Sequence, residues 1–166
     1  RTILKDNVTI AGNTATKLGG GISGYGQYAY EKKGQITFEG EKIVIKDNSC
    51  TNNPGLANLA LETGYPIKIE KALTGSVVYA MVFSSTDPTS GVLTSGYTTK
   101  NSGAGLNDFF HYDGPSSYYM ALESDELTVK AVSGSNYAIS IPSTVGGVVT
   151  AAKQIAAEGE TVTITV

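Results

Sequence analysis

Short stretches in which apolar and polar side chains alternate recur along the chain, and they predict β-strands. Two of these stretches are informative because the residues after them also correspond. Residues 7–15 and 42–50 each place two β-branched side chains on one face of a strand, followed by an asparagine and a small residue. With a shift of 35 residues, Val8 corresponds to Ile43, Ile10 to Ile45, Asn13 to Asn48 and Ala15 to Cys50. The chain therefore contains an internal repeat.

This repeat predicts a solenoid of stacked strands, because a single copy cannot bury its apolar face and needs a neighbour above or below. In such a stack Asn13 and Asn48 would form a ladder just past the strands, where asparagine suits a turn. We interpret Ile67–Ile69 as a third, partial copy that follows Ile43–Ile45 after 24 residues and lacks the asparagine. The consecutive glycines Gly19–Gly21 would let a neighbouring layer approach closely.

Further strands are predicted along the rest of the chain. Up to residue 131 they are 36–38, 58–61, 66–69, the buried run 77–83, 91–94, and a hairpin of 118–122 with 126–130. A change of composition at 133–135 is typical of a linker. Beyond it we expect strands at 137–141, 148–151 and 161–166, with the Ala-rich stretch 153–159 as a loop.

Composition narrows the possible functions. The 166 residues carry 12 basic and 15 acidic side chains, a formal net charge of −3, which argues against a nucleic-acid partner because phosphate binding needs clustered Lys and Arg. One histidine and one cysteine exclude an internal disulfide, a cysteine zinc cluster and a site with two histidine ligands within this chain. No apolar run approaches the roughly 20 residues of a membrane-spanning helix. Because the chain starts at Arg1 without an initiator Met, we expect a piece of a longer protein.

Several of these segments resemble the parallel β-helix repeats of bacterial surface proteins. The resembling stretches are Val8–Ala15, Gly19–Ile22, Ile45–Asn48 and Asn58–Leu61. Similar repeats occur in autotransporter passengers, polymorphic outer-membrane proteins and large secreted proteins of gut-type Gram-positive bacteria. In the last group the final coils carry segments similar to Ile67–Thr74 and Gly91–Tyr97. Residues 137–166 resemble the opening of a small all-β repeat module found in such proteins.

The resemblance implies an all-β fold with two parts. Residues 1–131 would form the C-terminal coils and cap of a right-handed parallel β-helix, and residues 132–135 a linker. Residues 136–166 would form an incomplete, β-sandwich-like repeat module. The resemblance also implies a fragment of a long exported protein, located outside the cell or on its surface.

Candidate catalytic residues are few. Asp108, His111 and Asp113 form the one place where a histidine meets carboxylates, and a histidine oriented by an aspartate can act as a general base. The alternative is a polar loop anchored to the core by two phenylalanines. Glu39 and Glu41 are too close in sequence to form a simple glycosidase pair. We therefore assign no catalytic residue, no metal site and no cofactor.

Candidate ligand-binding residues are tyrosines. Tyr25, Tyr28 and Tyr30 lie in a glycine-rich excursion from the coil, where exposed rings could stack on a glycan. Tyr118 and Tyr119 could do the same. The alternative for both groups is that the rings cover the surface of the coil.

Asp6, Asp47 and Cys50 also carry side chains that could bind a metal ion or react. Calcium binding by Asp6 and Asp47 is conceivable, but the chain lacks a dense Asp/Gly calcium repeat. Cys50 is expected to be a small buried residue, because its counterpart in the repeat is alanine.

The function we expect is that of a non-catalytic, structural and adhesive segment of a bacterial cell-surface or secreted multi-module protein. Its partners would be host or bacterial glycans or surface proteins, met through loops such as 23–35 and 98–117, and exposed strand edges could also self-associate. Two alternatives remain open: the C-terminal part of a β-helix enzyme acting on polysaccharides, and a carbohydrate-binding module. A groove of acidic side chains would favour the enzyme.

Overall fold

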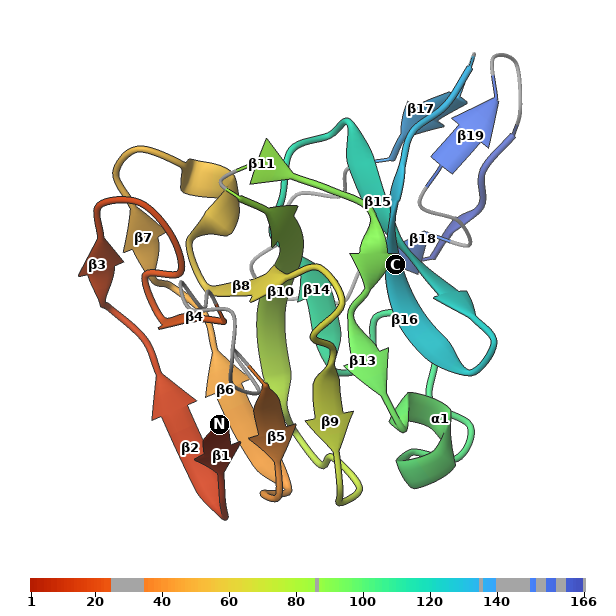
Figure 1. Ribbon diagram of the computed structural model, residues 1–166. Helices are drawn as coiled ribbons and strands as arrows, with labels where there is room; N and C mark the ends of the chain where they lie inside the picture. The colour runs from red at the N-terminus through yellow and green to blue at the C-terminus, as the bar shows by residue number, and fades with distance from the viewer. Residues whose placement is uncertain are drawn as a thin grey trace.

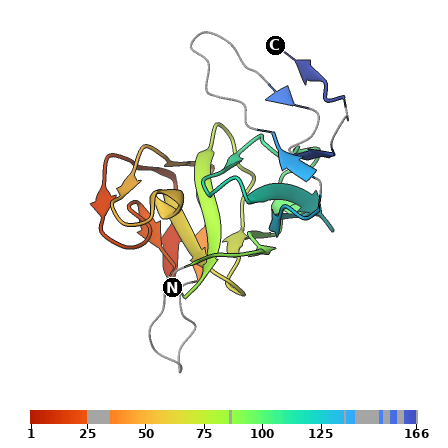
Figure 2. The ribbon, with the colours of Figure 1, turned by 90° about the horizontal axis from the view of Figure 1, so that it is seen from above.

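The computed structural model describes residues 1–24, 35–85, 87–134, 136–139, 150–151, 155–157 and 161–165. Parallel strands stack as a β-solenoid of about three turns, which confirms the prediction of an all-β, parallel β-helix fold. Figure 1 shows the stack from the first coil at its red end to an antiparallel sheet at its opposite end. Figure 2 shows the same order seen from above.

One wall of the solenoid is a four-stranded parallel sheet. Its strands, in spatial order, are β1 (Thr2–Leu4), β5 (Ile36–Phe38), β9 (Ile67–Ile69) and β13 (Thr94–Ser95). Leu4 pairs with Phe38, which pairs with Ile69, and all three side chains are buried. Each coil therefore adds one apolar layer to a continuous interior.

The second wall contains the repeat found in the sequence. It runs from β2 (Asn7–Ile10) through β6 (Lys42–Ile45) to β10 (Val77–Ser84). Val8 pairs with Ile43 and Ile10 with Ile45 in parallel register, as predicted.

The third copy of the repeat was predicted in the wrong place. Val44 pairs with Val77, so the copy that follows β6 is β10, after 33 residues. Ile67–Ile69 is β9 and belongs to the other wall. Strands of both walls alternate apolar and polar side chains, because both walls face the same apolar interior. The alternation in the sequence therefore does not show to which wall a strand belongs.

The long strand β10 spans two shorter strands of the coil before it. Its beginning pairs with β6, and Ala80–Phe83 pair with β8 (Leu59–Glu62), while β14 (Phe110–Tyr112) lies along its other edge. In the first coil, β4 (Ile22–Ser23) pairs with β8 in the same way. In each of the first two coils the chain therefore leaves this wall after one strand (β2 or β6) and returns to it in a second strand (β4 or β8). In the third coil the single strand β10 covers both positions without leaving the wall.

The two departing segments, residues 11–21 and 46–58, form what we call the side lobe. It contains the parallel pair β3 (Thr14–Ala15) and β7 (Ser49–Cys50) and the short 3₁₀ helix η1 (Pro54–Leu56). Figure 1 shows the lobe at the upper left, where β3 and β7 are labelled. A separate apolar cluster lies beneath it: Leu56, Ala60, Met81 and Phe83, with Leu18 and Tyr112 against them. Its strand residues point outward from the solenoid, opposite to Val78, Ala80 and Val82 of the main core.

An antiparallel sheet covers the end of the stack away from β1 and β2. It consists of β12 (Gly91–Val92), β16 (Glu126–Ala131) and β15 (Tyr118–Glu123), and it contributes Met120, Leu127 and Val129 to the main core. The predicted hairpin is confirmed; Ser124 and Asp125 form its turn, with φ of 48° and 68°. The single strand predicted at 91–94 is divided between β12 and β13, which lie in different sheets.

The last part of the chain forms two antiparallel pairs within the described residues. They are β17 (Asn136–Ala138) with β19 (Ile155–Ala157), and β18 (Thr150–Ala151) with β20 (Ile164–Thr165). The prediction of a loop is wrong for the described residues Ile155–Ala157 of the stretch 153–159, because they form β19, where Ala156 pairs with Tyr137. Among the helices of the described residues, none is long and apolar enough to cross a membrane. The longest described helix, α1 (Tyr97–Lys100), has a single turn.

Candidate functional site

Asp108, His111 and Asp113, considered together as candidate catalytic residues, make separate contacts in the structure. The Asp108 carboxylate accepts a hydrogen bond from the Gly105 N–H at 2.7 Å, within its own loop. His111 stacks on Tyr79 of the neighbouring coil, with ring centroids 4.9 Å apart. Within the described part of the chain, no hydrogen bond or ion pair joins His111 to either carboxylate. Burial lowers the pKa of His111, which favours the neutral imidazole of a packed ring.

An asparagine network joins the first two coils instead. The Asn13 backbone N–H and side-chain Nδ2 both donate to Asn48 Oδ1, at 3.1 and 3.0 Å. The two residues are 35 positions apart and occupy the same place in successive coils. The ladder predicted from the repeat is therefore present, and it lies where each coil leaves the wall for the side lobe.

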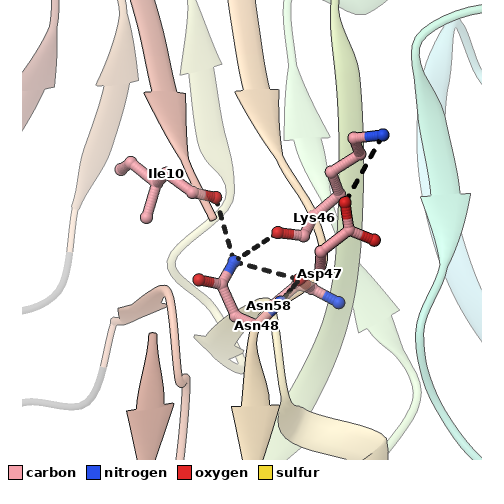
Figure 3. Close-up of polar contacts among 5 residues, drawn as sticks. All are labelled: Ile10, Lys46, Asp47, Asn48 and Asn58. Carbon is pink, nitrogen blue, oxygen red and sulfur yellow. Dashed lines mark hydrogen bonds and ion pairs between the residues drawn. The ribbon is translucent and has the colours of Figure 1, made fainter. Parts of the chain in front are cut away.

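The same asparagine closes the neck of the lobe. Asn48 Nδ2 donates to the Ile10 carbonyl at 3.0 Å, to the Lys46 carbonyl at 2.9 Å and to Asn58 Oδ1 at 3.0 Å. The Asn48 backbone N–H also donates to Asn58 Oδ1, at 2.9 Å. Figure 3 shows this arrangement around the Asn48 amide. Asn48 lies near the start of the segment 46–58 and Asn58 lies at its end, so one amide pair joins the place where the lobe leaves the wall to the place where it returns.

Asp113 extends the network to the coil beyond β10. Its Oδ2 accepts hydrogen bonds from the Asn58 backbone N–H and from Asn58 Nδ2, both at 2.9 Å. Burial raises the pKa of Asp113, and the two bonds from Asn58 oppose that rise. The network thus links four side chains from segments far apart in the sequence: Asn13, Asn48, Asn58 and Asp113.

Glycine makes the stacking of the lobe possible. The Gly19 N–H donates to the Leu56 carbonyl at 2.7 Å, and the Gly21 N–H donates to the Asn58 carbonyl at 3.1 Å. A Cβ at Gly20 would collide with the backbone carbonyl oxygens of Ser49 and Ala57. The close approach expected of Gly19–Gly21 is therefore confirmed.

A groove runs along the corner that follows the first wall. It has a volume of about 460 Å³ and is lined by Lys5, Asp6, Glu39, Glu70 and Lys71. Glu39 forms ion pairs with Lys5 at 3.3 Å and with Arg1 at 3.8 Å.

The carboxylates of this groove have cationic neighbours. Glu70 lies 2.5 Å from Lys68 Nζ, and that hydrogen bond lowers the pKa of Glu70. The ion pair with Lys68 favours an ionised Glu70 and not the protonated carboxyl that a glycosidase acid needs.

The remaining candidate residues have varied positions. Tyr25, Tyr28 and Tyr30 lie outside the described residues, so their predicted glycan contact stays a prediction. Tyr118 and Tyr119 are partly buried on β15. Among the described residues, no group of three or more His, Cys, Asp or Glu side chains could hold a metal ion.

The structure also shows the surroundings of the cysteine and of the other acidic residues considered as binding or reactive groups. Cys50 is 4% exposed and pairs with Ala15, as expected of a small buried residue. Asp47, considered for calcium, forms an ion pair with Lys46 at 3.4 Å. The Glu39 carboxylate is ion-paired with Lys5 and Arg1, and the backbone carbonyl of Glu41 accepts a hydrogen bond from Ser76 Oγ at 3.0 Å.

Sequence reasoning missed Asn58 and Asp113 as members of the network. Asn58 was assigned to a strand and Asp113 to a histidine cluster, although each stands directly beside a strand, as Asn48 does. The position of each residue beside a strand could have indicated a role like that of Asn48. The hydrogen bonds between Asn58 and Asp113, however, depend on β8 and β14 lying on opposite sides of β10.

Comparison with known proteins gave no match to a family model, to a curated protein or to a solved structure.

Proposed function

We propose that this chain is a non-catalytic, structural and adhesive segment of a bacterial cell-surface or secreted multi-module protein. In this proposal the solenoid is a stiff support, and the side lobe is a surface that it presents to host or bacterial glycans or surface proteins. The resemblance of the repeats to bacterial surface proteins gives the context.

The observation that carries the proposal is the neck of the side lobe. Asn48 and Asn58 are only 8% and 6% exposed, and their amides are hydrogen-bonded across the neck. Buried amides are costly to desolvate, so a network of this kind fixes one position of the loops it joins. The lobe is therefore held rigidly, as a binding surface needs to be.

The outer surface of the lobe carries hydroxyl groups in register. Thr14 Oγ1 and Ser49 Oγ lie 2.8 Å apart on adjacent strands, and both residues are exposed. Thr16 and Thr51, which follow one residue beyond each strand, are exposed as well. Exposed hydroxyls donate and accept hydrogen bonds, which suits sugar hydroxyls or a polar protein surface.

A binding array of glycans and surface proteins tests the proposal. We expect at least one component to bind the intact chain, and the double substitution Thr14→Val with Ser49→Ala to weaken that binding by about tenfold, since two exposed hydrogen-bonding groups are removed. Thr99→Val, an exposed threonine of α1, is the matched control and should bind as the parent does. Absence of any bound component, or unchanged binding by the double variant, would overturn the lobe as the adhesive surface.

The enzyme alternative has one observation in its favour, the groove that contains Asp6, Glu39 and Glu70. Release of reducing ends or unsaturated products from a polysaccharide by the purified chain would support this alternative and overturn the non-catalytic proposal. The carbohydrate-binding alternative is distinguished on the same array. Loss of glycan binding by Tyr25→Ala with Tyr28→Ala would assign the contact to the tyrosines instead of to the lobe.

A further inference from the structure

The outer face of the second wall carries apolar side chains that solvent partly reaches. Ile45 of β6 and Val78 of β10 are register partners, and both are 0% exposed because they point into the solenoid. Since successive residues of a strand point to opposite faces, Val44 of β6 and Val77 and Tyr79 of β10 point outward. All three are partly buried. Val44 and Val77 pair in register, so they form one apolar step on this face.

Two stacked rings stand beside the valines. His111 of β14 is the register partner of Tyr79, and the two ring centroids are 4.9 Å apart with 30° between the ring planes. Among the described residues, neither the Tyr79 hydroxyl nor a ring nitrogen of His111 has a hydrogen-bond partner. Burial lowers the pKa of His111, and a neutral imidazole has one nitrogen that donates and one that accepts. The rings therefore present unused hydrogen-bonding groups, held in place by their stacking.

A lysine lies on the other side of the valines. Lys42 is two residues before Val44 on β6, so it points to the same outer face, and it is exposed. Within the described part of the chain Lys42 forms no ion pair. Lys46, just after β6, is paired with Asp47, but the two side chains are 46% and 71% exposed, and such a pair contributes little. The face therefore carries an unpaired positive charge in a chain of net charge −3.

The backbone of this face is already used by the sheet. β6 lies between β2 and β10, and β10 lies between β6 and β8 on one side and β14 on the other. An extended peptide therefore cannot add a strand here, and a ligand has to be recognised by side chains. A pyranose ring offers apolar C–H groups for the valines and hydroxyls for the polar ring atoms. A carboxylate on that ring would complement the lysine.

We propose that the outer face of β6, β10 and β14 binds an acidic sugar residue of a polysaccharide. The sugar ring lies over Val44 and Val77. Its hydroxyls form hydrogen bonds with Tyr79 and His111, and its carboxylate pairs with Lys42. This site uses none of the hydroxyls of the side lobe, so the inference stands or fails separately from the adhesive function proposed for the lobe.

Two matched oligosaccharides test the charge requirement in a titration with the full chain. One probe is a tetramer of β-1,4-linked glucuronic acid. The other is the methyl ester of the same tetramer, which keeps the rings and hydroxyls but carries no charge. We expect the acid to bind at least about tenfold more tightly than the ester, with an affinity that falls as salt is added. Equal binding of the two probes, or no binding of the acid, overturns the proposal.

Conservative substitutions test the residues while keeping their packing. Tyr79→Phe and His111→Phe each keep a ring in the stack and remove its polar atoms, and each should weaken binding of the acid about fivefold. Lys42→Gln should lower the preference for the acid over the ester at least about threefold. Lys100→Gln, at an exposed lysine of α1, is the matched control for a lost charge and should bind as the parent does. Unchanged binding by both ring variants, or equal effects of the two lysine variants, overturns the site.

Further measurements separate this site from the lobe and from general anion binding. Thr14→Val with Ser49→Ala should leave the affinity for the acid unchanged; a loss would assign the contact to the lobe and overturn this inference. A glutamate tetramer and a single-stranded DNA tetramer carry negative charge without a pyranose ring, and both should bind at least about tenfold more weakly than the acid. If either binds as tightly, the face attracts anions in general, and the assignment to an acidic sugar is overturned.

Discussion

Asn13 and Asn48 lie 35 residues apart in the sequence and one coil apart in the structure, where Asn13 Nδ2 donates to Asn48 Oδ1 over 3.0 Å. This contact repeats the strand register just before it, in which Val8 pairs with Ile43. The asparagine ladder and the strand pairing therefore follow from the same 35-residue repeat. The asparagines do more than continue the ladder, because Asn48 is also bonded to Asn58 across the neck of the side lobe.

Substituting Asn48 should destabilise the protein more than substituting Asn13. Asn48→Ala leaves the Asn13 N–H without its acceptor and removes the Nδ2 bonds to Ile10, Lys46 and Asn58. At roughly 1 kcal/mol for each hydrogen bond, we expect a loss of about 2–4 kcal/mol in the free energy of unfolding. Asn13→Ala, at an exposed position, should cost about 1 kcal/mol. Urea unfolding measures both values, and an equal or smaller cost for Asn48→Ala would contradict the neck as described.

Replacing Asp113 by asparagine should preserve stability at neutral pH or increase it. Both bonds from Asn58 are accepted by one oxygen, Oδ2, so an amide oxygen at the same place can accept them. The raised pKa shows that burial disfavours the charged form by more than the bonds favour it. Asp113→Ala lacks any acceptor for the Asn58 N–H and should lose about 1–3 kcal/mol.

The pH dependence of this effect has a definite sign. A carboxyl whose pKa is higher in the folded state than in the unfolded state stabilises the fold below the unfolded pKa of about 3.9, and this contribution is lost as pH rises through the folded pKa. As pH rises from about 3.9 through the folded pKa of Asp113, the free energy of unfolding of Asp113→Asn should therefore increase relative to that of the parent. A lowered pKa of Asp113 in an NMR titration would contradict this account.

A methyl group at Gly20 should disturb the lobe more than one at Gly12. The Cβ at Gly20 meets two backbone carbonyl oxygens that cannot move without shifting the second coil, whereas a Cβ at Gly12 has no atom within 4 Å. Gly12 has a φ of +70°, so Gly12→Ala should cost about 1 kcal/mol from backbone strain alone. We expect Gly20→Ala to cost at least about 2 kcal/mol, in line with other overpacked sites. Thermal unfolding of the two variants compares them, and equal midpoints would show that the first two coils are not in close contact there.

The sequence predicted the features that are local and repeated. The register of Val8 with Ile43, the asparagine ladder and the close approach at Gly19–Gly21 all follow from residue types at fixed spacing, and all are present. The burial of Cys50 opposite Ala15 follows in the same way.

Other features depend on the path of the chain between the repeats. The third copy was predicted at Ile67–Ile69 from apolar alternation alone, because neither that segment nor the true copy at Val77 carries the marker asparagine. It is absent there for a physical reason: β10 runs straight past the point where the earlier coils turn into the lobe, so no neck needs closing. Asn58 and Asp113 are 55 residues apart in the sequence, and no local sequence pattern predicts a hydrogen bond between residues so far apart.

The order of the coils is tested most directly by cysteine cross-linking in a Cys50→Ala background. Thr9, Val44 and Val77 are register partners in successive coils, and neighbouring parallel strands about 4.8 Å apart are within the Cα range of a disulfide. We expect oxidation to join Thr9→Cys to Val44→Cys, and Val44→Cys to Val77→Cys, in the folded protein. A Val44→Cys/Lys68→Cys pair should stay reduced, because β6 and β9 lie in different walls. A cross-link between positions 44 and 68 in place of 44 and 77 would contradict the solenoid as described.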